Sequence, residues 1–130
     1  MKQTQLEIHF TYTEQDDGLI LSESGCEYES LQDFIHTDIL GFCGCGMAED
    51  VDKLVYAILT LLNIKDSLTF KEYIAKLEED LPTDALQYFM FYWLDSKGFT
   101  EHGGSVPGWL SDKGQELLNL LKLVYEREST

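Results

Sequence analysis

The spacing of apolar and polar residues at the start of the chain predicts a β-hairpin. From residue 6 to residue 13 every second side chain is apolar, which is the period-two pattern of a strand with one buried face. Asp16-Asp17-Gly18 follows, and an Asp-Gly pair supplies the positive backbone angles that a tight turn requires. Leu19-Ile20-Leu21 then forms the second strand, so we expect an N-terminal β-hairpin.

Helical periodicity dominates the rest of the chain. Apolar residues three and four positions apart predict helices that begin near residues 30, 51, 69, 83 and 111. Ser30 and Thr83 are suited to cap two of these helices, and Thr69-Phe70-Lys71-Glu72 matches a capping box. Pro82 ends the helix that the box begins, and Gly98 can close the next helix in the left-handed conformation.

Length and composition indicate one folded domain. A chain of 130 residues is close to the common domain size, and its apolar fraction of 44% suffices for a packed core. We expect a single domain over residues 1–130 with a mostly helical α+β fold of four to five helices and an N-terminal β-hairpin.

No stretch approaches the ~20 apolar residues of a membrane span or resembles a secretory signal, and three cysteines suit a reducing compartment. The expected location is the cytoplasm.

The helix expected to begin at Thr83 is apolar on nearly every side. Tyr88, Phe91 and Tyr92 add apolar surface outside its main stripe. Such a helix either lies at the centre of the fold or presents an aromatic face to a partner. Tyr88 and Tyr92 are therefore candidate partner-binding residues.

The charge of the chain argues against direct nucleic-acid binding and favours a basic protein partner instead. The net charge is −15, of which residues 1–52 carry −11 and residues 53–130 carry −4. Nucleic-acid binding gains most of its free energy from Lys and Arg, whereas an acidic surface attracts basic proteins. Glu27, Glu29 and Asp33 are candidate residues for such a contact. The alternative is that the charge only keeps the protein soluble.

The segment 99–110 predicts a hairpin or an ordered loop, because it contains three glycines and Pro107. The interpretation that we favour places Trp109 in the core. The alternative is a recognition loop that offers Glu101, His102 and Ser105 to a partner.

Cys43 and Cys45 are candidate ligands of a metal site. Thiolates of Cys43 and Cys45 could bind zinc together with Cys26 and His36. Structural zinc sites usually have two to four residues between paired cysteines, whereas a single residue separates Cys43 from Cys45. The alternative is that these cysteines are small buried thiols, and our main expectation is a protein without a cofactor. Acidic residues just after Cys45 oppose both a phosphate and a reactive thiolate, and we expect no enzyme activity.

Two stretches in the last 45 residues carry a resemblance to a known family. Leu94-Asp95-Ser96-Lys97-Gly98-Phe99-Thr100-Glu101 precedes Trp109-Leu110-Ser111-Asp112-Lys113-Gly114, which opens a helix. This order resembles the wing of winged-helix proteins such as the multiple-antibiotic-resistance-type repressors. The resemblance implies a winged-helix-like C-terminal half with residues 83–97 at the recognition-helix position. In residues 83–97 aromatic side chains stand where that family has basic and polar ones, which suits a winged helix that binds a protein.

A second resemblance concerns small uncharacterised proteins of bacteriophages and prophages. It rests on Phe42-Cys43-Gly44-Cys45-Gly46, Tyr92-Trp93-Leu94-Asp95 and Glu101-His102-Gly103-Gly104-Ser105. It implies a small acidic interaction protein that binds a host protein, for example to inhibit a nucleic-acid-binding defence protein. The alternative hypothesis is a metal- or small-ligand-binding domain that uses Cys43 and Cys45 or Glu101 and His102. The sequence leaves a homodimer open.

Overall fold

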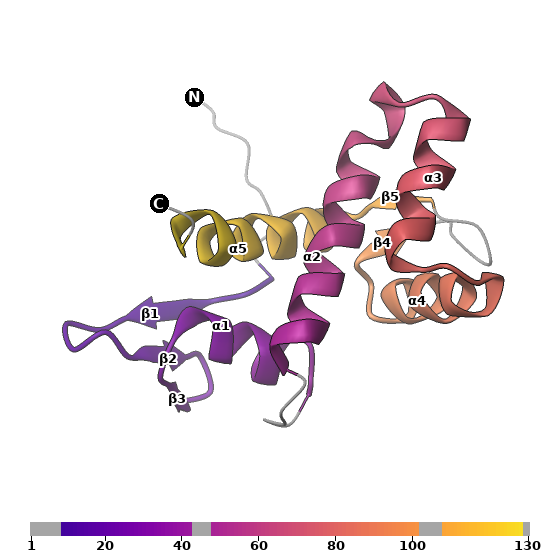
Figure 1. Ribbon diagram of the computed structural model, residues 1–130. Coiled ribbons are helices and arrows are strands. Elements are labelled where there is room, and N and C mark those ends of the chain that lie inside the picture. The colour runs from indigo at the N-terminus through magenta and orange to yellow at the C-terminus, as the bar shows by residue number, and fades with distance from the viewer. Residues whose placement is uncertain (1–8, 43–47, 102–107, 129–130) are drawn as a thin grey trace, which may run out of the picture.

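The computed structural model describes residues 9–42, 48–101 and 108–128, which contain five α-helices and five short strands (Figure 1). The helices are α1 (Leu31–Phe34), α2 (Ala48–Ile64), α3 (Phe70–Asp80), α4 (Asp84–Ser96) and α5 (Asp112–Glu128). A π-helical turn, η1 (Ile35–Ile39), follows α1, and a 3-10 turn, η2 (Lys65–Ser67), follows α2. The strands are β1 (Tyr12–Glu14), β2 (Ile20–Ser22), β3 (Glu27–Tyr28), β4 (Thr100–Glu101) and β5 (Trp109–Leu110). The predicted mostly helical α+β fold is confirmed.

Helix α2 runs through the middle of the molecule and separates two groups of elements (Figure 1). The three-stranded sheet and α1 lie on one side, and α3, α4 and the β4–β5 pair lie on the other. Helix α2 packs against α3, α5 and β5. Its inner face is buried because Val55, Ile58 and Leu59 lie on one helical stripe.

The core is one cluster of buried side chains to which all five helices or their flanking turns contribute. Among its members, Phe34, Leu59, Leu94 and Leu121 are at most 1% exposed. None of the helices in the described residues is long and apolar enough to span a membrane.

The N-terminal sheet contains the predicted hairpin and one strand more. Strands β1 and β2 are antiparallel with Tyr12 opposite Ser22, and β3 adds to the other edge of β2. The turn uses Gly18 at φ 90°, as the Asp-Gly pair predicted. Strand β1 begins at Tyr12, and just before it the amides of His9 and Phe10 donate to the Glu116 carboxylate of α5, at 2.9–3.1 Å.

Glu116 therefore ties the start of the described chain to the C-terminal helix. Burial alone would raise the pKa of its carboxyl, but hydrogen bonds from the amides of His9 and Phe10 and from the His9 ring outweigh burial and lower it. The charged carboxylate thus stabilises the contact between the two ends of the fold.

Glu116→Gln is expected to lower the free energy of unfolding near neutral pH by about 1–2 kcal/mol, because hydrogen bonds to a charged acceptor are the stronger ones. The pKa of Glu116 is lower in the folded than in the unfolded chain, so its contribution is present above the unfolded pKa and is lost as the pH falls through the folded pKa. The difference between variant and wild type should shrink in acid. Urea unfolding at several pH values measures it, with exposed Glu29→Gln as the control; a difference that stays constant with pH contradicts the assignment.

Local signals place the helix ends as expected. The hydroxyls of Ser30 and Thr83 accept the amides of Asp33 and Leu86, at 3.1 Å in both cases. Thr69 and Glu72 form the complete capping box. These confirmed caps fix where α1, α3 and α4 begin.

The two-stranded pair β4–β5 follows α4 and leads into α5, which is the order that the winged-helix resemblance implied. The expected burial of Trp109 is wrong, because this side chain is 55% exposed. Neighbouring side chains in a strand point to opposite faces, and it is Leu110 that packs against the core. Trp109 consequently faces outward opposite Glu101.

Candidate interaction surface

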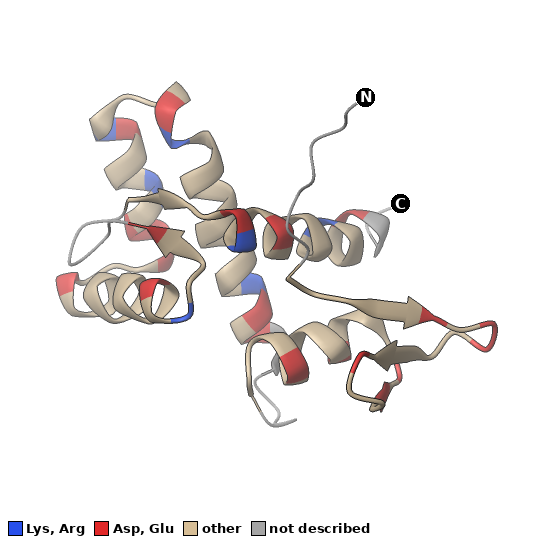
Figure 2. Cartoon of the chain, turned by 180° about the vertical axis from the view of Figure 1, so that it is seen from behind, with Lys and Arg blue, Asp and Glu red and all other residues tan. Residues whose placement is uncertain are grey.

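Acidic side chains concentrate in residues 9–42, which we call the acidic lobe. This segment holds eight Asp and Glu residues and no Lys or Arg, and Figure 2 shows their distribution over β1–β3 and α1. The predicted contact residues Glu27 and Glu29 are exposed on it. Asp33 is half-buried, and its carboxylate accepts the Thr37 hydroxyl at 3.3 Å. The Glu27 carboxylate accepts a hydrogen bond from the Gln15 side-chain amide at 3.2 Å. The lobe is therefore a strongly negative surface on which Glu27 and Glu29 are more exposed than Asp33.

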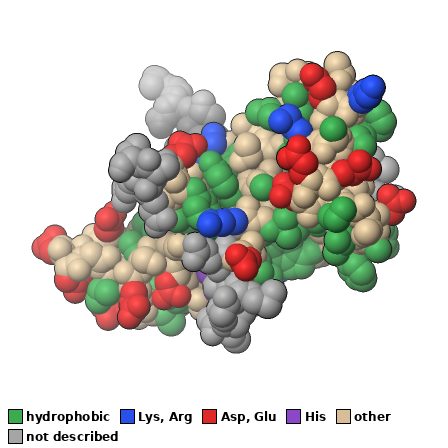
Figure 3. Space-filling view, viewed as in Figure 1, with side chains coloured by type: hydrophobic (Ala, Val, Ile, Leu, Met, Phe, Trp, Pro, Cys, Tyr) green, Lys and Arg blue, Asp and Glu red, His purple; other side chains and the backbone are tan. Residues whose placement is uncertain are grey.

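Helix α4 exposes aromatic side chains to solvent. Tyr88, Phe89 and Tyr92, which we call the aromatic face, are 50%, 69% and 60% exposed. The rings of Tyr88 and Tyr92, one helical turn apart, stack with centroids 6.0 Å apart. The opposite side of the helix is buried through Phe91 and Leu94, which explains why the sequence is apolar on nearly every side. Figure 3 shows hydrophobic side chains gathered at this end of the molecule.

The aromatic face contains no charged residue. Between Asp84 and Asp95 ten consecutive residues are uncharged, in a protein whose net charge is −15. Contiguous exposed apolar surface on a soluble protein typically marks an interaction site. Of the two alternatives from the sequence, the structure has Tyr88 and Tyr92 exposed, together with Phe89. That a partner binds them stays a prediction.

A groove runs between α3 and α4 on one side of the aromatic face. Its volume is about 660 Å³, and we call it the α3–α4 groove. Its lining is mostly apolar and consists of Lys65, Leu68, Thr69, Phe70, Tyr73, Ile74, Leu77, Asp84, Gln87, Tyr88 and Phe91. Burial raises the pKa of Tyr73 to about 12, and its buried hydroxyl has no hydrogen-bond partner among the described residues.

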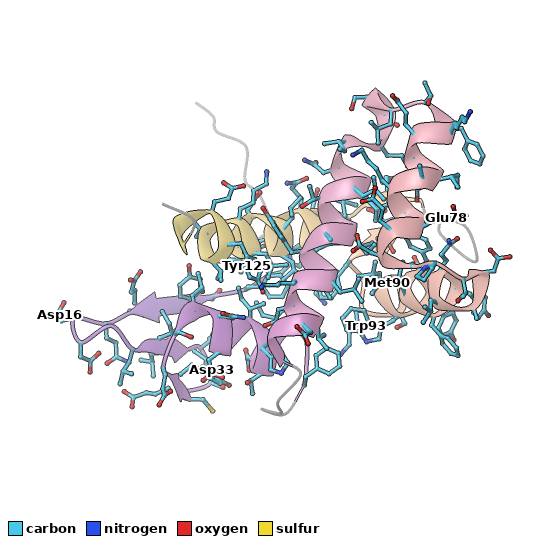
Figure 4. All side chains as sticks on the ribbon, in the orientation of Figure 1. Asp16, Asp33, Glu78, Met90, Trp93 and Tyr125 are labelled. Atoms are coloured by element: carbon cyan, nitrogen blue, oxygen red, sulfur yellow. The ribbon has the colours of Figure 1, made fainter. Side chains whose placement is uncertain are left out.

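A shallower hollow lies on the other side of the aromatic face, between α4 and α2. Its volume is about 270 Å³, and Phe89 forms part of its rim together with Leu54 of α2. Met90 and Trp93 lie on this side of α4 (Figure 4). Phe42 stacks on Trp93 with ring centroids 5.8 Å apart, so the chain before α2 is anchored to α4.

A buried histidine and aspartate pair lies beneath Phe42. The His36 Nδ1 and Asp52 Oδ1 atoms are 2.9 Å apart, and the two side chains are 3% and 0% exposed. Burial raises the pKa of Asp52, and the hydrogen bond with His36 opposes that change. His36 Nε2 is buried without a partner in the described structure. His36 lies in the π-helical turn η1, and Phe42 stacks on its ring at 5.5 Å.

The predicted metal ligands fall largely outside the described residues. Cys43 and Cys45 do so entirely, and Cys26 is exposed on the acidic lobe. Among the residues that the structure describes, no three His, Cys, Asp or Glu side chains form a group that could hold a metal ion. The zinc site stays a prediction.

The alternative site at residues 101–105 is described only in part. Glu101 is exposed on β4, which fits the interpretation of a recognition loop. His102 and Ser105 lie outside the described residues. The exposed Trp109 opposite Glu101 adds an aromatic side chain that the sequence analysis had assigned to the core.

Comparisons with known proteins give no relative for this chain: no family model matches it, and neither a curated protein nor a solved structure matches it.

Proposed function

We propose that this chain is a non-enzymatic interaction protein that binds a basic protein partner. The observation that carries the proposal is the aromatic face, which exposes Tyr88, Phe89 and Tyr92 on a helix without charge between Asp84 and Asp95. Aromatic side chains, tyrosine above all, are enriched among the residues that dominate binding energy in protein interfaces.

The sign of the charge determines the kind of partner. Two copies of this chain would each bring a net charge of −15 to their interface, and this repulsion disfavours a homodimer. A basic partner gains from the same charge, since complementary fields raise the association rate. The acidic lobe and the aromatic face lie on opposite sides of α2 (Figure 1), so the lobe acts mainly by steering the partner.

The proposal has a narrower form that rests on the bacteriophage resemblance. In this form the chain acts in the cytoplasm of an infected host and inhibits a nucleic-acid-binding defence protein. Such a partner is basic where it binds phosphates, and an acidic surface competes for that site. Direct binding of nucleic acid by this chain forms no part of the proposal.

Replacing the aromatic face should abolish capture of the partner. Phe89→Ala and Tyr92→Ala are each expected to weaken binding by about 2 kcal/mol, which is roughly 30-fold, because each removes a large contact side chain. The measurement is a pull-down from host lysate at low and high salt, followed by titration of the purified partner.

Glu27→Lys with Glu29→Lys should slow association with the partner and reduce the salt dependence of the association rate.

Leu123→Ala is the matched control, because Leu123 is 44% exposed on α5, away from the aromatic face. It should leave the affinity unchanged. A partner that binds the Phe89→Ala and Tyr92→Ala variants as tightly as wild type, or a nucleic acid captured in place of a protein, contradicts the proposal.

A further inference from the structure

The two walls of the α3–α4 groove have the same helical spacing. On each helix the lining residues fall at i, i+3, i+4 and i+7: Phe70, Tyr73, Ile74 and Leu77 on α3, and Asp84, Gln87, Tyr88 and Phe91 on α4. This is the stripe that one helix presents to another when they pack. The groove therefore has the form of a seat for a third helix.

We propose that the α3–α4 groove receives one face of an amphipathic helix of the partner, with apolar residues turned into the groove and basic residues turned outward. This inference rests on the proposed function, because it names the part of the basic partner that docks.

The geometry of the groove favours a helix over an extended segment. A strand binds by pairing its backbone with a sheet edge, but both walls are helices whose backbone groups are bonded within the helix. From i to i+7 each wall extends about 10 Å along its axis, which corresponds to two turns of an opposing helix. The volume of about 660 Å³ lies in the range of ligand pockets and accommodates several anchor side chains.

The charges around the groove favour a basic helix. Helices α3 and α4 together contain six Asp and Glu residues and two lysines. Asp84 and Lys65 both line the groove itself, and Glu78, which follows the lining residue Leu77, is exposed on α3 (Figure 4 labels Glu78). A helix with lysine or arginine beside its apolar face would bring these cations near Asp84 and Glu78, while the apolar face displaces water from Phe70 and Tyr88.

Binding of designed peptides to the full chain tests this inference. The probe is a helical peptide of about 15 residues with leucines at i, i+3, i+4 and i+7 and lysines on the other face. It should bind with a Kd of micromolar order and perturb the methyl resonances of Ile74 and Leu77. Phe70→Ala and Tyr88→Ala, both at exposed wall positions, should weaken binding about tenfold or more.

Leu123→Ala is the matched control, because Leu123 is an exposed apolar residue on α5 that does not line the groove. It should leave peptide binding unchanged. A scrambled peptide of equal charge that binds equally well, or affinity unaffected by both wall variants, overturns the inference. So does a peptide that fails to bind at about 1 mM, or methyl shifts confined to residues outside the groove.

The two proposals fail in different ways. If the captured partner is lost with Phe89→Ala and Tyr92→Ala but retained with Phe70→Ala, the proposed function stands and the groove is not the docking site. If wild-type protein captures no basic partner, the proposed function fails, whatever the peptide does.

Discussion

Gly114→Ala is expected to lower the free energy of unfolding by more than about 3 kcal/mol. A Cβ atom at this position would lie 2.0 Å from the carbonyl oxygen and 2.9 Å from the carbonyl carbon of Phe99. Both are backbone atoms, so either the first turn of α5 or the chain before β4 must move. Helix propensity alone would make alanine about 1 kcal/mol better than glycine here, so the expected effect has the opposite sign.

The chain segments cannot separate easily, because several bonds hold them at this point. The Ser111 amide donates to the Phe99 carbonyl at 3.0 Å, the Ser111 hydroxyl donates to the Gly98 carbonyl, and the Lys113 ammonium donates to the Lys97 carbonyl at 3.0 Å. Phe99 itself is 1% exposed in the core. Moving it to make room would therefore disturb packing as well as hydrogen bonds.

Urea unfolding of Gly114→Ala and of Asn119→Ala measures this effect. Asn119 is exposed on the same helix, where alanine should be neutral or slightly stabilising. A Gly114→Ala protein within about 1 kcal/mol of wild type would show that α5 and Phe99 approach less closely than the structure indicates.

Features controlled by neighbouring residues were predictable from the sequence. The caps at Ser30, Thr69 and Thr83 and the positive φ at Gly98 follow from side chains within four positions. Features that depend on contacts between segments far apart in the sequence were not predictable. The sequence contains no sign that the Glu116 carboxylate accepts the amides of His9 and Phe10, more than 100 residues earlier in the chain.

The sequence predicted single residues of the candidate site but not how the fold brings them together. The many aromatic residues of α4 indicated either burial or a binding face, and only packing in the folded core decides that Phe91 is buried and Tyr92 exposed. The groove requires two helices to be placed side by side, which no spacing within one helix reveals. Trp109 was expected to pack into the core from an ordered loop, whereas it lies in a strand and the neighbouring Leu110 packs against the core.

Asp52 had a signal that the sequence analysis missed. It lies three residues before Val55 and seven before Leu59, on the buried stripe of α2, where an acidic residue is unexpected without a partner. The partner is His36, sixteen residues earlier in the chain. An acidic residue on an apolar stripe thus indicates that another polar side chain lies opposite it.

Replacing only one member of the His36–Asp52 pair should destabilise the protein strongly. His36→Leu keeps approximately the same side-chain volume but leaves the Asp52 carboxylate buried without its closest partner, and the expected loss in unfolding free energy is about 3 kcal/mol or more. The remaining contact, Gln32 Nε2 at 3.4 Å, is too long to replace the bond of 2.9 Å. Asp52→Leu should cost about 1–3 kcal/mol, because the imidazole then lacks partners on both nitrogens.

The double variant separates the pair interaction from the packing around it. When both polar groups are replaced together, no buried charge remains, so the loss should be smaller than the sum of the two single losses by about 1–3 kcal/mol. Unfolding of all four proteins by urea gives this coupling directly. Losses that add to within about 0.5 kcal/mol would show that the two side chains do not interact in solution. A large coupling would establish that the pair holds η1 against α2, beneath the Phe42 ring that stacks on Trp93 of α4.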